Sequence, residues 1–185
     1  MPILPLLGLP EALPPKARLM GLDLGTKTIG LAISDPGLAV ASPLETIRRA
    51  RRFADDAKAL LARIEGRGVG GLVLGLHVNM DGSEGPRAQS TRAFAENLLK
   101  LKDLPLAFWD ERLSTAVVNR FLIEEADMTR RRRAQVVDKM AAAYILQGAL
   151  DAIRNRKSED RSQKSDVRGE ELPPPPLRGR DGEGG

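Results

Sequence analysis

One acidic residue inside an apolar strand constrains this chain more than any other feature. Residues 19–24 and 28–34 are apolar or β-branched and predict two short strands, and Gly25 gives the tight turn between them the backbone freedom it needs. Asp23 lies in the first strand, where an ionised side chain is costly unless a base, backbone amides or a metal ion compensates it. The segment therefore predicts a β-hairpin that carries either a structural acid or a functional one.

The segments that follow predict a mixed α/β domain. A third strand over residues 39–47 continues an antiparallel meander, and short apolar runs over 71–76 and 106–109 predict two more strands. Apolar residues at helical spacing predict four helices, over residues 53–66, 86–101, 114–122 and 134–154. This order predicts a ribonuclease-H-like α/β fold, a mixed five-stranded sheet with three antiparallel strands and helices on both faces.

Composition divides the chain into three parts. Residues 1–18 are apolar but carry five prolines and no basic start, so they make a poor signal peptide and we expect a flexible N-terminal extension. Residues 19–156 are the predicted folded domain, and residues 157–185, which are charged and proline-rich, predict a disordered tail. There is no run of 18 apolar residues to cross a membrane, and the absence of cysteine suits a cytoplasmic protein.

The excess of positive over negative charge lies in the first 150 residues. The net charge is +4, and the eight basic and eight acidic residues from Asp151 onward cancel, so the excess lies in residues 1–150. Two arginine-rich runs, over residues 48–52 and 130–133, are dense enough to bind a phosphate backbone. Such runs also occur as solvated surface, and the sequence leaves both interpretations open.

Three acids fall where predicted elements begin or end near the centre of the expected sheet. Asp23 is in the first strand, Glu111 follows the fifth strand, and Asp138 lies early in the last helix. In the inferred topology these carboxylates meet, and because they would repel one another they imply a cation. Oxygen ligands favour Mg²⁺ or Mn²⁺, and two such ions roughly 3.5–4 Å apart can activate water and stabilise the leaving oxygen of a phosphodiester.

Four motifs in this order resemble the YqgF/RuvX family of Holliday-junction-resolvase-like nucleases, which are implicated in maturing the 5′ end of pre-16S ribosomal RNA. The motifs span residues 23–30, 79–84, 110–115 and 138–142. The resemblance covers about residues 19–150 and implies that Asp23, Glu111 and Asp138 are the catalytic, metal-binding residues. His77, the single histidine, stands where the family has proline; we interpret it as a loop residue and leave a role at the substrate open.

The same motifs and the second arginine run supply the predicted nucleic-acid contacts, which are Lys27, Asn79, Arg112, Ser114, Thr115, Arg130, Arg131, Arg132 and Arg133. The resemblance implies a cytoplasmic, metal-dependent endonuclease, a monomer or weak homodimer, that processes pre-16S ribosomal RNA. A Holliday-junction resolvase acting on branched DNA and a non-catalytic RNA-binding ribosome-assembly factor remain alternatives. The Asp23–Lys27 turn also resembles that of ATPases and sugar kinases, but those enzymes need two such domains and 185 residues supply one.

Overall fold

The computed structural model describes residues 3–110 and 130–168, and in the last helix it describes the side chains of residues 138–158. Five strands form one sheet in the order β3-β2-β1-β4-β5. Their bounds are β1 (Arg18–Leu24), β2 (Thr28–Ser34), β3 (Ala41–Arg48), β4 (Val69–Leu76) and β5 (Leu106–Asp110). The first three strands are antiparallel, and β4 and β5 run parallel to β1. The predicted ribonuclease-H-like sheet, with β1 at its centre, is confirmed.

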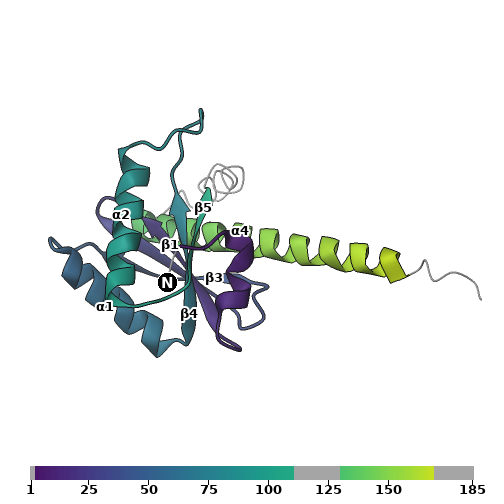
Figure 1. Cartoon of the computed structure of the whole chain (residues 1–185). Coiled ribbons are helices and arrows are strands. Elements are labelled where there is room, and N and C mark those ends of the chain that lie inside the picture. The colour runs from purple at the N-terminus through teal and green to yellow at the C-terminus, as the bar shows by residue number, and fades with distance from the viewer. Residues whose placement is uncertain (1–2, 111–129, 169–185) are drawn as a thin grey trace, which may run out of the picture.

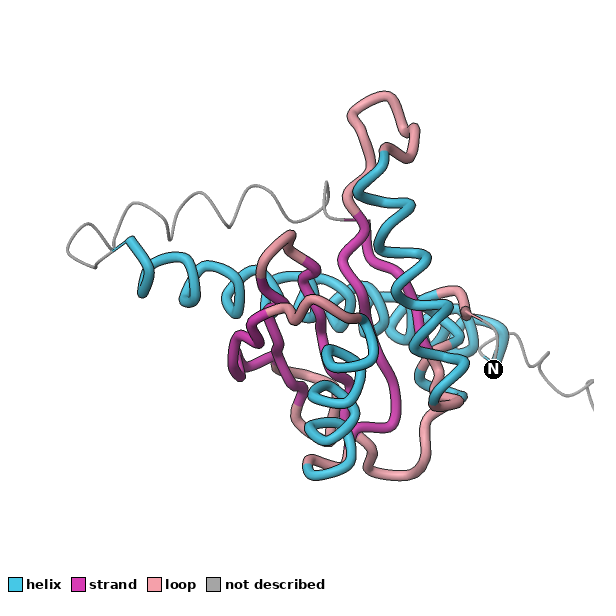
Figure 2. The backbone as a smooth tube through the Cα atoms, turned by 90° about the vertical axis from the view of Figure 1, so that its left-hand side faces the viewer, coloured by secondary structure: helices cyan, strands magenta, loops and turns pink. Residues whose placement is uncertain are grey.

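Helices cover both faces of the sheet (Figures 1 and 2). On one face α1 (Phe53–Gly66) and α2 (Pro86–Leu101) bury Leu60 and Leu98 against β1, β2 and β4. On the other face α4 (Arg130–Arg168) buries Leu146 and Ala149 against Leu19 and Val73. All eight residues of β4 are buried, which explains why this strand reads as an unbroken apolar run.

Two glycines allow the backbone of α4 to rest directly on β1 and β2. A Cβ added at Gly21 would lie 2.8 Å from the carbonyl oxygen of Ala142 and 2.7 Å from Cβ of Leu146. A Cβ added at Gly30 would lie 2.0 Å from the carbonyl oxygen of Asp138, far inside van der Waals contact. These two positions therefore fix how closely α4 approaches the centre of the sheet.

The N-terminal segment packs on the domain and differs from the flexible extension that its prolines suggested. Two short 3-10 helices, η1 (Leu6–Gly8) and η2 (Pro10–Ala12), hold Leu9 between them, and its side chain is fully buried with the α4 cluster. The backbone N–H of Leu4 donates to the carbonyl oxygen of Leu106 in β5 at 2.8 Å. Proline tolerates these tight turns, and burial of Leu9 helps to hold the segment on the domain.

The last helix is longer than its apolar stripe predicted. It begins at Arg130 rather than near Ala134, so the arginines at 130–133 belong to its first turn instead of preceding it. It continues to Arg168, beyond the boundary expected at residue 156, and projects past the sheet (Figure 1). Residues 154–168 contain no proline or glycine and many good helix formers, which favours continuation of the helix.

Two predicted segments lie outside the described residues, namely the helix over 114–122 and the end of the tail from residue 169. Among the helices that the structure describes, none combines the length and the apolar character needed to cross a membrane.

Candidate active site

Near the C-terminal end of β1, Asp23 lies on the face of the sheet that α4 covers, the face on which Gly30 meets the backbone of Asp138. Asp23 pairs with Gly30 in the β1–β2 register, so the Cβ positions of the two residues lie on the same face of the sheet, about 4.5–5.5 Å apart. The Cβ direction of Gly30 points at the backbone of Asp138 in α4. Asp23 therefore faces the start of the described part of α4, and both acids are only partly buried.

Thr28 orients the second acid. Its hydroxyl donates a hydrogen bond of 2.6 Å to Oδ2 of Asp138, across 110 residues of chain. A short bond from a hydroxyl to a carboxylate is charge-assisted, and it holds the ionised carboxylate in one orientation. Sequence reasoning missed Thr28 because it reads as an ordinary β-branched strand residue; the one available signal is that it lies two positions before Gly30, on the same face.

The ends of three parallel strands meet beside these acids. β1, β4 and β5 run in the same direction, so Leu24, Leu76 and Asp110 terminate at one edge of the sheet. Glu111, the third predicted acid, is the next residue after β5 and lies outside the described residues. Within the described ranges no three acidic, histidine or cysteine side chains gather as a metal site. Of the three predicted ligands, Asp23 and Asp138 lie within these ranges.

A braced loop, residues 77–85, follows β4 at this edge. The side-chain amide of Asn79 donates to the hydroxyl of Ser83 at 2.9 Å, and the backbone N–H of Asn79 donates to the carbonyl oxygen of Ser83. Glu84 accepts hydrogen bonds from Nε of Arg92, at 2.6 Å, and from its Nη2. Half-buried His77 immediately follows β4, in the loop position that the sequence predicted.

Glu84 and Arg92 shift each other's pKa. The hydrogen bonds from Arg92 lower the pKa of the Glu84 carboxyl, and the same bonds raise the pKa of Arg92. The Arg92 guanidinium also lies 4.7 Å from the centre of the Phe108 ring in β5. The loop is thereby tied to α2 and to the neighbouring strand, which keeps Asn79 at the edge where the acids lie.

The other predicted nucleic-acid contacts are placed only in part. Lys27 is exposed in the β1–β2 turn, and its carbonyl oxygen accepts a hydrogen bond of 2.9 Å from the backbone N–H of Arg49. Arg112, Ser114 and Thr115 lie outside the described residues, as do the side chains of residues 130–133.

Comparison with known proteins identifies a matching family and close relatives. The family model described as "RuvX: Holliday junction resolvase" matches residues 17–152. A protein of Rhodospirillum rubrum named "Putative pre-16S rRNA nuclease" is 62% identical over 159 residues, which cover 86% of this chain and 98% of that protein. A protein of the same name from Phenylobacterium zucineum is 63% identical over 156 residues, 84% of this chain and 99% of that protein.

Solved structures of resolvases are more distantly similar. The yeast mitochondrial Holliday junction resolvase Ydc2 gives a TM-score of 0.47 at 11% identity, covering 85% of this chain and 89% of that chain. Thermus thermophilus RuvC in complex with a Holliday junction substrate gives 0.44 at 13% identity, covering 70% and 91%. With a family model matched over most of its length and relatives above 60% identity, the chain belongs to the RuvX family.

Proposed function

We propose that this protein is a metal-dependent endonuclease that cleaves phosphodiester bonds in the 5′ leader of pre-16S ribosomal RNA. The observation that supports it most is the meeting of Asp23 and Asp138 on one face of the sheet, where Gly30 lets α4 approach. The proposed substrate, pre-16S ribosomal RNA, is taken from the names of the relatives. A protein with this substrate acts in the bacterial cytoplasm, as a monomer or weak homodimer.

The residues fit a hard divalent cation. Asp23, Asp138 and, from the sequence, Glu111 would hold one or two Mg²⁺ or Mn²⁺ ions, because their donors are all oxygen and the chain has no cysteine. Such ions, when bound, lower the pKa of a water nucleophile and stabilise charge on the leaving oxygen. Thr28 keeps the Asp138 carboxylate turned toward the start of β2 through its 2.6 Å hydrogen bond.

The basic residues around this edge would hold the substrate backbone. Lys27, which is exposed in the turn directly after β1, would contact a phosphate of the substrate. Asn79 and the motif residues Arg112, Ser114 and Thr115 would add contacts from the loops after β4 and β5. The four arginines at 130–133, in the first turn of α4, would add sequence-independent attraction shortly before Asp138.

Branched DNA is the second candidate substrate, because the matching family model is described as a Holliday junction resolvase. Backbone contacts by lysine and arginine serve both nucleic acids, so the residues named above do not separate them. A direct comparison of cleavage separates the two substrates. Purified protein is incubated with Mg²⁺ and either a pre-16S leader RNA or a four-way DNA junction. Cleavage of the RNA at defined positions is expected, with slower or no cleavage of the junction.

Two conservative variants test the catalytic assignment. Asp23→Asn and Asp138→Asn each remove one ligand charge while keeping size and hydrogen bonding, so both should abolish cleavage and leave the melting temperature equal or higher. Asp55→Asn is the matched control, since Asp55 is exposed in α1 and pairs with Arg52. If both active-site variants cleave at the parental rate, these acids are not catalytic. That result would favour the alternative of a non-catalytic RNA-binding assembly factor.

A further inference from the structure

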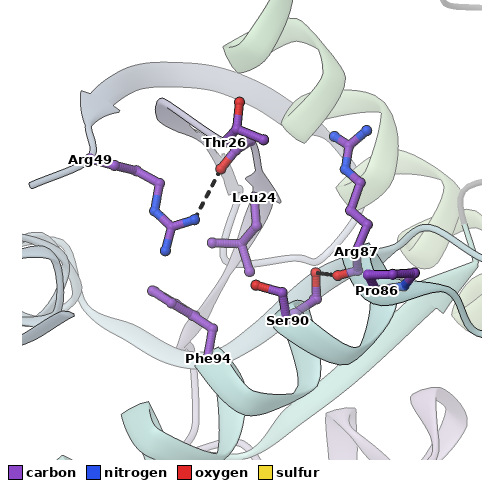
Figure 3. Close-up of a pocket in the computed structure, with 9 residues that line it drawn as sticks. Leu24, Thr26, Arg49, Pro86, Arg87, Ser90 and Phe94 are labelled. Atoms are coloured by element: carbon purple, nitrogen blue, oxygen red, sulfur yellow. Dashed lines mark hydrogen bonds between the residues drawn. The ribbon is translucent and has the colours of Figure 1, made fainter. Parts of the chain in front are cut away.

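A pocket of about 310 Å³ opens at the same end of the sheet as Asp23, on the opposite face. Its walls come from the β1–β2 turn, from the segment between β3 and α1, and from the first turns of α2 (Figure 3). Leu24 and Phe94, both buried in the core between the sheet and α2, give it an apolar floor. The volume is at the lower end of the roughly 300–1,000 Å³ of small-molecule sites, which suits one nucleotide rather than a duplex.

One arginine is fixed in the pocket wall. Nη1 of Arg49 donates to the carbonyl oxygen of Gly25 at 3.1 Å, and its Nε donates to Oδ2 of Asp56 at 3.3 Å. Asp56 is 2% exposed and also accepts a 2.6 Å hydrogen bond from the backbone N–H of Ala50, so it anchors this segment. The guanidinium of Arg49 lies 5.9 Å from the centre of the Phe94 ring. These contacts hold a planar cation at the mouth of an apolar cavity.

A second arginine, Arg87, lines the pocket. Arg87 projects from the first turn of α2, is exposed, and forms no ion pair with the residues that the structure describes (Figure 3). Ser90, one turn further along α2, is exposed on the same wall. The pocket therefore combines an apolar floor, a fixed guanidinium plane and an uncompensated cation, with no acidic side chain among its lining residues.

We propose that this pocket receives one unpaired nucleotide of the RNA substrate, with its base against Arg49 and the apolar floor and its phosphate at Arg87. Proteins recognise single-stranded RNA by stacking unstacked bases on aromatic rings or arginine planes, and arginine binds the phosphate. The pocket matches each part of that ligand. The inference rests on the proposed function, because it takes the substrate to be RNA that is cut at Asp23 and Asp138.

The position of the pocket relative to the acids explains its use. Asp23 and Leu24 are neighbours in β1, so their side chains point to opposite faces of the sheet. The β1–β2 turn, with exposed Thr26 and Lys27, forms the edge between the two faces. A strand cut on the Asp23 face and passing over this turn would place a flanking nucleotide in the pocket. The pocket would thereby set the register of cleavage and favour sites with an unpaired flanking base.

The test compares three single substitutions in the full chain. Ser90→Trp fills the pocket from an exposed helix position, Arg87→Gln removes the uncompensated charge, and Arg18→Gln is the matched control at the opposite end of β1. Binding of a fluorescein-labelled pre-16S leader RNA is measured in EDTA, so that cleavage does not enter the readout. A second RNA carries 2-aminopurine at unpaired positions near the cleavage site, whose fluorescence reports unstacking.

The pocket predicts a separate signature for each variant. Ser90→Trp should weaken binding roughly 5- to 150-fold, the equivalent of one lost stacked base, and remove the 2-aminopurine signal. Arg87→Gln should reduce the magnitude of the negative slope of log affinity against log salt by about 0.7, the value of one single-strand phosphate contact. Arg18→Gln should change neither. Parental binding by Ser90→Trp, or equal effects of Arg87→Gln and Arg18→Gln, would overturn the pocket assignment.

Cleavage assays keep this inference separable from the function it rests on. If the parent binds and cuts the RNA in Mg²⁺ while Ser90→Trp binds equally well, the pocket assignment fails and the nuclease stands. If the parent neither binds nor cuts the RNA, both proposals fall together.

Discussion

Replacing Gly30 with alanine tests the closest contact between the sheet and α4. The added Cβ would lie 2.0 Å from the carbonyl oxygen of Asp138, 2.5 Å from its carbonyl carbon and 3.1 Å from the backbone nitrogen of Lys139. All three are backbone atoms of one helix, so no side chain can rotate away to relieve the overlap. The helix must move off the sheet, and Asp138 must move away from Asp23 with it.

The size of the effect follows from that geometry. Overpacking a core costs roughly 1–3 kcal/mol, and a clash with rigid backbone belongs at the upper end, about 3 kcal/mol. For a domain of this size each kcal/mol lowers the melting temperature by about 2–4 °C, so Gly30→Ala should melt about 6–12 °C lower. A displacement of α4 by about 1 Å would also cost roughly 100-fold in cleavage rate.

The assay is thermal melting by circular dichroism, together with cleavage of the leader RNA at a temperature where both proteins are folded. Gly66→Ala is the matched control: Gly66 ends α1, and a Cβ there meets nothing within 4 Å. It should be neutral or stabilise the fold by about 0.4–1 kcal/mol. If Gly30→Ala melts within 1 °C of the parent and cleaves normally, α4 does not rest on β2 as described.

Three further substitutions test other parts of the structure. Leu9→Ala should lower the free energy of unfolding by about 2–5 kcal/mol because the side chain is fully buried. Leu7→Ala, at a residue 47% exposed, should lower it far less. Equal melting temperatures for the two variants would mean that the N-terminal segment is not docked. Asp56→Ala should lower the free energy of unfolding by about 2–3 kcal/mol, because it removes a buried acid that accepts two charge-assisted hydrogen bonds. Asp55→Ala, on the exposed side of the same helix, should lower it by under about 1 kcal/mol. Arg92 lowers the pKa of Glu84, so their interaction stabilises the fold above the ordinary value of 4.5 and is lost as the pH falls through the lowered pKa. The gap in melting temperature between the parent and Glu84→Gln should therefore be present at pH 7 and close in acid, and a gap that widens in acid would contradict this sign.

The regular elements of the fold were predictable from sequence because their signals are local. The helix over 53–66 and the helix over 86–101 were predicted at the residues where α1 and α2 begin and end, since apolar spacing, Gly66 and Pro86 mark them. The docking of residues 3–17 and the extension of α4 were not predicted. Prolines and charges dominate the composition of these segments, whereas their structure depends on burial of a few leucines and on helix continuation.

The candidate site residues rest on two kinds of sequence signal. Asp23 stands out because an acid in a buried strand is anomalous, and Asp138 because the inferred topology and the family motifs place it nearby. Thr28 was missed because its hydroxyl acts on a residue 110 positions away. The pocket at Arg49 and Arg87 was missed because three distant segments build it and none is unusual alone.

The most direct test of the central claim is a crystal of the full chain soaked in Mn²⁺ and measured for anomalous scattering. A peak is expected beside the carboxylates of Asp23 and Asp138, and it should be lost in crystals of Asp23→Asn. Absence of the peak in parent crystals that bind Mn²⁺ elsewhere, or its persistence in both Asp23→Asn and Asp138→Asn, would contradict the proposal that these acids form the metal site of a nuclease.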